Sequence, residues 1–255
     1  MRKLLCSTIL ILYVLLFSAG CNFLEPQNTV VSHVTTEYTY QYCTPTPMPT
    51  PVVSYMDESG SMQSLDDAIE FALLINPSRK MTQLTINTGI PLFTNTDFEK
   101  TSTEFTTDSQ GRPSTAFAIV TIETTQMDVD AYSPISIDSY SPPGWSDSKY
   151  VRKVPLISDK LCGYRLPAGI ITGTKTLKSS LDAIETKVLN VVTKNPDLSV
   201  LYRVTPVYKD NNILPYGLIV EAYSIEDSGK AISICYYLLN NQSGRRINYA
   251  TGKIS

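Results

Sequence analysis

Two segments of the chain carry apolar residues at helical spacing. The first predicted helix runs from Ser64 to Ile75, where Asp67 follows Ser64 in a capping pattern and Pro77 ends the segment. The second runs from about Ser180 to Lys194. In both segments the apolar residues recur every three or four positions and share one face: Leu65, Ala68, Ile69, Ala72 and Leu73 in the first; Leu181, Ile184, Val188, Val191 and Val192 in the second.

Short runs of β-forming residues predict strands between and after these helices. The last three predicted strands are joined by turns at Asp210-Asn211-Asn212 and at Glu226-Asp227-Ser228-Gly229, so they are expected to pair as antiparallel hairpins. An antiparallel sheet with packed helices is an α+β fold. The predicted strands are Met81–Asn87, Thr115–Ile122, Tyr150–Ile157, Val200–Lys209, Tyr216–Ser224 and Ala231–Asn240.

The first twenty residues have the pattern of an export signal. Arg2-Lys3 is followed by an apolar run from Leu4 to Phe17, which is shorter than the roughly 20 residues of a membrane span. Ser18-Ala19-Gly20 then precedes Cys21, and this ending resembles a bacterial lipobox, although that motif usually has Leu where Ser18 stands. The resemblance implies cleavage before Cys21, lipidation of Cys21, and a mature protein anchored outside the cytoplasmic membrane. The alternatives are an ordinary secretory signal and an uncleaved anchor.

Residues 21–60 are predicted to form a tether after the signal peptide of residues 1–20. The stretch from Thr44 to Pro51 alternates proline with other residues, which favours an extended polyproline II spacer. The one histidine of the chain, His33, lies in this tether. A single folded domain is expected over residues 61–255.

Charge and cysteine content narrow the choice of chemistry. From Val151 onward the chain has 14 basic and 8 acidic residues, whereas residues 21–150 have 5 basic and 16 acidic. A basic C-terminal part fits a surface that faces a polyanion, or an ordinary solvated face. Cys43, Cys162 and Cys235 leave at least one thiol unpaired within the mature chain, and Cys162 and Cys235 are expected to be buried free thiols. With no Cys-x-x-Cys or His/Cys cluster, a zinc site is not expected.

A series of short motifs carries a family resemblance over roughly Leu84 to the end of the chain. Their order and spacing resemble the DNA/RNA non-specific endonuclease family, in its DNA-entry nuclease branch, and imply a ββα-metal nuclease-like fold. The motifs are Ile86-Asn87, Ile90-Pro91-Leu92-Phe93, Asp108-Ser109-Gln110-Gly111-Arg112, Pro142-Pro143-Gly144-Trp145, Gly163-Tyr164, Ile171-Thr172-Gly173-Thr174, Leu201-Tyr202-Arg203-Val204-Thr205-Pro206-Val207-Tyr208, Glu221-Ala222-Tyr223-Ser224 and Ile247-Asn248-Tyr249-Ala250-Thr251-Gly252.

The resemblance implies a histidine general base and an asparagine that holds one Mg²⁺. The histidine position is Lys160, and the preceding arginine position is Ser158. The metal asparagine position is Lys178, four residues after Thr174, and Glu185 is one residue out of step with a glutamate of the family. A charged lysine neither accepts a proton nor binds a cation. The sequence therefore predicts a degenerate catalytic site, with no cofactor, or Mg²⁺ if activity survives.

The same lysines are candidates for phosphate binding, because an ammonium attracts a phosphate without doing chemistry. Surface lysines on a relic of the site are the plainer interpretation. The predicted nucleic-acid-binding residues are Lys160, Arg165, Lys175, Lys178 and Arg203, with Tyr150, Tyr164, Tyr202 and Trp145 as residues that could stack on bases.

Three functions remain open from the sequence. The favoured hypothesis is a surface lipoprotein whose nuclease-like domain binds DNA or RNA, or a protein partner, without cutting. The second is an active Mg²⁺-dependent endonuclease with a rearranged site, and the third is a structural or protein-interaction module.

Overall fold

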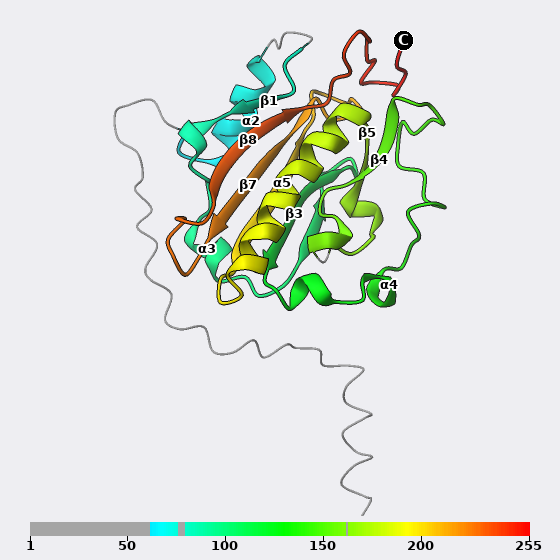
Figure 1. Cartoon of the computed structure of the whole chain (residues 1–255). Helices are drawn as coiled ribbons and strands as arrows, with labels where there is room; N and C mark the ends of the chain where they lie inside the picture. The colour runs from blue at the N-terminus through cyan, green and yellow to red at the C-terminus, as the bar shows by residue number, and fades with distance from the viewer. Residues whose placement is uncertain (1–61, 76–79, 162) are drawn as a thin grey trace, which may run out of the picture. The chain divides into compact units, whose positions relative to one another are not determined.

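A six-stranded antiparallel sheet organises the folded region (Figure 1). The structure is a computed structural model that describes residues 62–75, 80–161 and 163–255. The strand order is β1-β8-β7-β6-β3-β2, with every neighbouring pair antiparallel. The strands are β1 (Gln83–Thr85), β2 (Glu104–Thr107), β3 (Pro113–Val120), β6 (Val200–Val207), β7 (Gly217–Ser224) and β8 (Ser233–Leu239).

A separate hairpin and the longest described helix complete the central architecture. Strands β4 (Val151–Pro155) and β5 (Ile170–Thr174) pair with each other, and β5 leads directly into α5 (Lys175–Lys194). The Thr174 hydroxyl caps α5 by accepting a hydrogen bond from the Leu177 amide at 3.0 Å. The ββα order of this unit is the one that the family resemblance implies.

Helix α5 lies across one face of the sheet (Figure 1). Alternate residues of β6, which are Val200, Tyr202 and Val204, belong to the same buried cluster, as the two-residue period of a strand requires. Full burial of each apolar side chain stabilises the fold by about 1.5–3 kcal/mol. The side chains that α5 contributes are Leu177, Leu181, Ile184, Val188 and Val192.

The opposite face of the sheet is covered by α2 (Leu65–Leu74) and by the segment that follows β1. Ala68 and Ala72 of α2 pack in one cluster with Ile219 and Tyr237 of the sheet. The remaining short helices are η1 (Asn87–Gly89), α3 (Asn95–Phe98), η2 (Thr124–Gln126), α4 (Val129–Tyr132), η3 (Asp159–Leu161) and η4 (Pro167–Gly169).

Both predicted helices are confirmed, with one boundary corrected. Ser64 and Asp67 form the predicted capping box at the start of α2, with hydrogen bonds of 3.1 and 3.0 Å. The second helix begins at Lys175, five residues before the predicted start at Ser180. Its first turn is polar on the exposed side, so the apolar periodicity becomes visible only further along.

The six predicted strands are present with shifted ends, while β2 and β5 were not predicted as strands. The shortest is β1, with three residues in place of the predicted seven. Cys235 is a buried free thiol, as predicted, and burial raises its pKa. Together these elements form the expected α+β fold.

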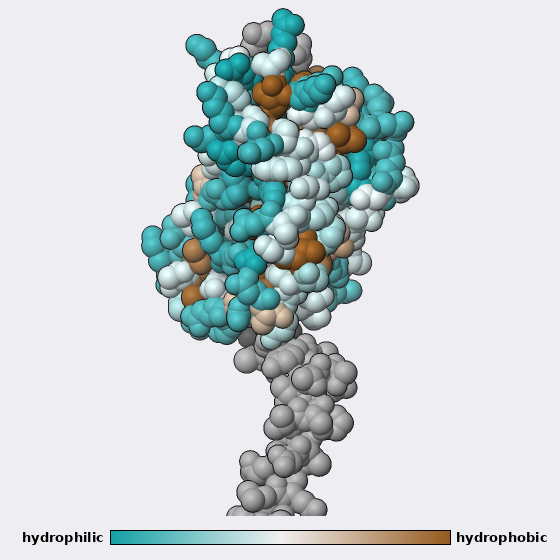
Figure 2. All heavy atoms as spheres, turned by 90° about the vertical axis from the view of Figure 1, so that its right-hand side faces the viewer, coloured by the Kyte–Doolittle hydropathy of each residue, from teal (hydrophilic) through white to brown (hydrophobic). Residues whose placement is uncertain are grey.

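Several predictions lie outside the described residues. They are the signal peptide, Cys21, the tether with His33 and Cys43, the domain boundary at residue 61, and the state of Cys162. None of the helices in the described ranges is long and apolar enough to cross a membrane. Figure 2 shows a mainly hydrophilic face with scattered apolar residues.

Candidate functional site

The residues predicted to stand at the family's catalytic positions come from the turn after β4 and from α5. Strand β4 runs into the short helix η3, which carries Lys160, and the amides of Leu161 and Gly163 both donate to the Ser158 carbonyl at 3.0 Å. Gly163 is required for this turn, because a Cβ there would lie 2.0 Å from the Ile157 carbonyl oxygen. The turn therefore presents Ser158 and Lys160 at a fixed place beside α5.

Glu185 is the central residue of this site and is completely buried. Its Oε1 accepts a 2.7 Å hydrogen bond from the Ser158 amide, while its Oε2 has no hydrogen-bond partner. The Ser158 hydroxyl is also buried without an ordinary hydrogen bond, although it is close enough to lower the pKa of Glu185. A half-satisfied carboxylate is costly inside a protein.

Burial raises the pKa of the Glu185 carboxyl to about 7. The Ser158 amide and the charge of Lys178 lower this pKa, and the charge of Asp182 raises it. The hydroxyl of Tyr202 lies beneath α5, fully buried and without a hydrogen-bond partner, and burial raises its pKa with a further contribution from Glu185. We call Ser158, Lys160, Lys178, Asp182 and Glu185 the Glu185 site.

Lys178 occupies one face of α5 two turns before Glu185. Its ammonium forms an ion pair with Asp182 one turn further on, and its side chain is 28% exposed. Lys160 is exposed in η3 and forms no ion pair with any residue that the structure describes. The site therefore has one neutralised cation, one free cation and one buried carboxyl.

The other predicted phosphate-binding residues have different surroundings. Arg165 forms ion pairs with Asp130 and Asp159, which raise its pKa. Lys175 is exposed at the start of α5. Neither residue belongs to the Glu185 site, because Arg165 is held by two carboxylates outside it and the Lys175 amide donates to Tyr150.

Arg203 lies on the other face of the sheet and is buried. Its guanidinium donates to Glu221 at 2.7 Å, to Asp97 at 2.9 Å and to the Leu92 carbonyl at 2.9 Å. It also lies 4.7 Å from the centre of the Phe93 ring. These contacts give Arg203 a place in the core, so the prediction that it binds nucleic acid does not fit its position. Full burial likewise removes Tyr202 from the residues that could stack on bases.

The donor atoms of the Glu185 site do not fit a divalent metal ion. An ammonium has no lone pair to offer, and the Asp182 carboxylate is already engaged by Lys178. One oxygen of Glu185 is used by Ser158. In the described ranges there is no group of three or more His, Cys, Asp or Glu side chains that could hold a metal ion.

The fold and the ββα unit define the class of protein to which the chain belongs. The architecture matches ββα-metal nucleases, an α+β class. The DNA/RNA non-specific endonuclease family model matches residues 94–226, which is 133 of the 255 residues. The chain therefore belongs to the DNA/RNA non-specific endonuclease family, and the resemblance found in the sequence is confirmed.

Individual relatives agree with this assignment. A Streptococcus dysgalactiae subsp. equisimilis protein named "Deoxyribonuclease" is 35% identical over an alignment of 102 positions that covers 38% of this chain and 30% of that protein. The chain thus matches less than a third of the length of this curated relative.

Solved structures extend the similarity to the fold. NucA from Streptococcus agalactiae without metal has a TM-score of 0.56 at 25% identity, over 68% of this chain and 86% of NucA. NucA with magnesium bound has a TM-score of 0.59 at 22% identity, over 75% and 97%. Sda1 nuclease with bound zinc has a TM-score of 0.53 at 23% identity, over 61% and 81%.

Two features of the site were missed in the sequence. The Lys178–Asp182 pair has the four-residue spacing of a helical ion pair, so this signal was present. The contact between Ser158 and Glu185 joins residues 27 positions apart and carries no local signal.

Proposed function

We propose that this protein is an exported lipoprotein whose endonuclease-family domain binds nucleic acid without cutting it. The observation that carries the proposal is the pair of lysines, Lys160 and Lys178, at the positions of the general base and the metal ligand. The ion pair of Lys178 with Asp182 supports it, because the Asp182 carboxylate is then engaged by an ammonium and is not available to bind a metal ion.

Lys160 and Lys178 would contribute differently to the binding of a phosphate. Lys160 is free to meet a backbone phosphate, and it holds no lone pair for a proton while it is charged. Lys178 adds a weaker attraction, because Asp182 neutralises most of its charge. Mg²⁺, where a family member binds it, supplies Lewis-acid stabilisation of the scissile phosphate. No residue of this site replaces that contribution.

A plasmid-nicking assay with Mg²⁺ and an EDTA control tests the loss of hydrolysis. The purified protein is expected to show no nicking above the buffer blank, because a general base alone contributes about 10²–10⁴-fold. EDTA-sensitive nicking by pure protein would favour the active enzyme instead. The double variant Lys160→His with Lys178→Asn returns a base and a neutral ligand, so nicking by that variant alone would support the proposal.

Fluorescence anisotropy with short DNA tests the binding. Binding is expected to be indifferent to sequence and to weaken steeply with salt. Lys160→Ala with Lys178→Ala should lower the salt slope by about one unit per lost phosphate contact. Lys187→Ala with Lys194→Ala removes the same charge from the exposed side and the end of α5, and it is the matched control. If wild-type protein does not bind at low salt, the interaction-module hypothesis takes precedence.

The lipid anchor is tested separately. The proposal rests on Cys21 after Ser18-Ala19-Gly20. The mature protein should partition with membranes, and Cys21→Ala should release it or block processing. Recovery of that variant in membranes at the normal mature size would contradict lipidation.

A further inference from the structure

Two basic side chains, those of Lys149 and Arg245, lie over the ring of Tyr150 just before β4, and Lys175 follows at the start of α5. The Arg245 guanidinium carbon lies 4.6 Å from the centre of the Tyr150 ring, and the Lys149 ammonium lies 5.0 Å from it. Arg245 also donates a 2.7 Å hydrogen bond to the Tyr150 hydroxyl. Lys175 joins the group through its backbone amide, which donates to the Tyr150 carbonyl at 2.8 Å. We call Lys149, Tyr150, Lys175 and Arg245 the Tyr150 patch.

An aromatic ring, rather than a carboxylate, contacts the Lys149 and Arg245 cations of this patch. None of Lys149, Lys175 and Arg245 forms an ion pair with another residue of the described ranges. A ring holds a cation by its quadrupole and leaves the positive charge uncancelled. The hydrogen bond from Arg245 and the nearby Lys149 lower the pKa of Tyr150, as expected in a positive field. Asp147, exposed two residues before Lys149, offsets part of this charge.

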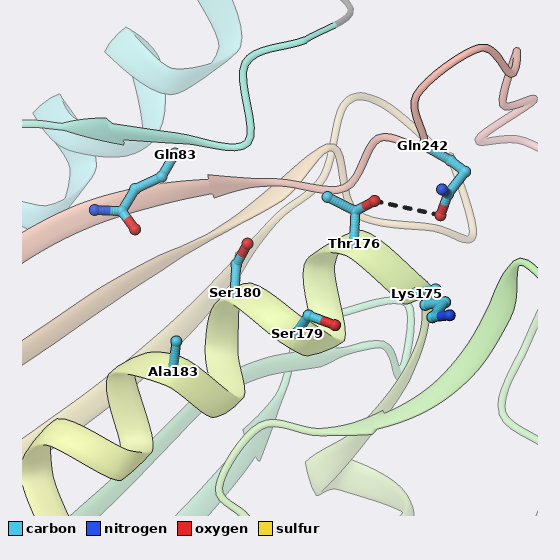
Figure 3. A pocket seen from close by; sticks show the side chains of 7 residues that line it. All are labelled: Gln83, Lys175, Thr176, Ser179, Ser180, Ala183 and Gln242. Atoms are coloured by element: carbon cyan, nitrogen blue, oxygen red, sulfur yellow. Dashed lines mark hydrogen bonds between the residues drawn. The ribbon is translucent and has the colours of Figure 1, made fainter.

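A polar groove continues from Lys175 along α5 (Figure 3). Its volume is about 530 Å³. Figure 3 shows Gln83 of β1 and Gln242 on one side and α5 on the other, with Thr176 and Gln242 joined by a 3.3 Å hydrogen bond. No acidic side chain lines the groove, whose residues are Gln83, Lys175, Thr176, Ser179, Ser180, Ala183 and Gln242.

We propose that the Tyr150 patch and this groove form a second phosphate-binding surface, which holds the backbone of a bound nucleic acid next to the Glu185 site. This inference rests on the proposed function and adds to it a surface along which the nucleic-acid backbone would bind. Lysine, arginine, hydroxyl and amide side chains are the groups that contact phosphate and sugar oxygens in nucleic-acid complexes. The patch supplies the charged members of this set, and the groove supplies the neutral ones.

Side chains provide the binding, because the backbone of the first helical turn is already occupied. The Lys175 amide is used by Tyr150, and the Leu177 amide is used by the Thr174 hydroxyl. The groove residues of α5, at positions 175, 176, 179, 180 and 183, adjoin Lys178 and Asp182, because Lys175 and Ser179 lie three residues before them on the helix. A strand held in the groove would therefore cross α5 near its start, beside the lysine of the Glu185 site.

Anisotropy with a fluorescent DNA duplex tests this surface. The triple variant Lys149→Ala, Lys175→Ala and Arg245→Ala should weaken binding at low salt by about tenfold or more and lower the salt slope by about two to three units. The control triple variant Lys187→Ala, Lys194→Ala and Lys230→Ala removes equal charge from exposed lysines elsewhere and should have a much smaller effect. Equal losses in the two variants would overturn the proposal. Lys175→Arg with Arg245→Lys keeps the charge and should keep the affinity.

Amide chemical shifts separate this proposal from the previous one. Titration of isotope-labelled protein with a short oligothymidylate should shift the amides of residues 175–180 and 242–245. Shifts at residues 158–161 report binding at the Glu185 site instead. Shifts confined to residues 158–161 would overturn the patch and leave the proposed function standing. Shifts confined to the patch would support it and remove the role of Lys160.

Discussion

Two buried charged groups lie on opposite faces of the same sheet, and they are accommodated in different ways. Arg203 and Glu221 are opposite each other on β6 and β7, and the guanidinium is bonded to two carboxylates and a carbonyl. On the other face Glu185 keeps one oxygen without a partner, beside unpaired hydroxyls of Ser158 and Tyr202.

The difference separates a fully bonded buried charge from a buried carboxyl that is only partly bonded. A buried ion pair is tolerated when nearly every donor and acceptor is used, which is the case around Arg203. Buried polar atoms without a partner are rare in proteins, and departures of this kind are expected at functional or strained sites. Among the described residues, three of the four buried side-chain atoms without a partner belong to Ser158, Glu185 and Tyr202. The comparison shows that the unsatisfied buried side-chain atoms of the described residues cluster around Glu185.

The largest expected effect on stability comes from removing the guanidinium of Arg203, which bonds to two carboxylates and a carbonyl. Arg203→Met should destabilise the protein by about 3–5 kcal/mol, because it removes the guanidinium that is paired with the buried carboxylates of Glu221 and Asp97. Urea unfolding monitored by circular dichroism measures this change. Arg165→Met is the control, since its carboxylate partners are 78% and 49% exposed, and it should cost no more than about 1 kcal/mol. Equal costs would erase the contrast between the two kinds of arginine.

The second effect concerns Glu185 on the other face of the sheet, and it is a pH dependence of the free energy of unfolding. The Glu185 carboxyl titrates near 4.5 in a model peptide and near 7 in the fold. Between these values the folded state keeps a proton that the unfolded state has lost, so the free energy of unfolding falls as pH rises through this window. The total loss is on the order of 3 kcal/mol. Glu185→Gln cannot ionise and can still accept the Ser158 amide.

Chemical denaturation of both proteins from pH 4 to pH 8 tests this expectation. The stability advantage of Glu185→Gln should be smallest at pH 4, grow up to about pH 7 and then stay constant. A difference that is independent of pH would mean that Glu185 is no more perturbed than an exposed glutamate. Glu226→Gln in the loop after β7 provides an exposed control.

The smallest effect concerns the hydroxyl beneath α5. Tyr202→Phe removes a buried oxygen that has no partner and should raise stability by about 1 kcal/mol. Tyr237→Phe on the opposite face serves as a second buried tyrosine for comparison. If Tyr202→Phe is destabilising, the hydroxyl has a bound water or side-chain partner, and the contrast between the two faces weakens.

The sequence predicted most where the physics is local. The capping box of α2 and the hairpins of β6 to β8 follow from spacing and turn residues, and both are confirmed. The assignment of Lys160 and Lys178 to the family's catalytic positions came from motif order and stays a prediction.

What the sequence could not predict depends on contacts between distant segments. Arg203 looked like a surface cation, and its burial becomes evident only when the register places it opposite Glu221. Carboxylates are almost never fully buried, so nothing in the sequence singled out Glu185 for burial. The Tyr150 patch joins residues 149, 175 and 245, which no periodicity connects.

The position of β8 within the sheet has a consequence for how the chain folds. Strand β8 lies between β1 and β7, and Gln83 pairs with Leu238 across more than 150 residues. During synthesis the N-terminal segments emerge first, so β1 has no strand to pair with until residues 233–239 are made, and the cluster that α2 packs in is incomplete until then. Pairing over such a separation is slow because a long loop must close first. The chain therefore stays incompletely folded until late in its synthesis, which suits a protein that we propose to be exported.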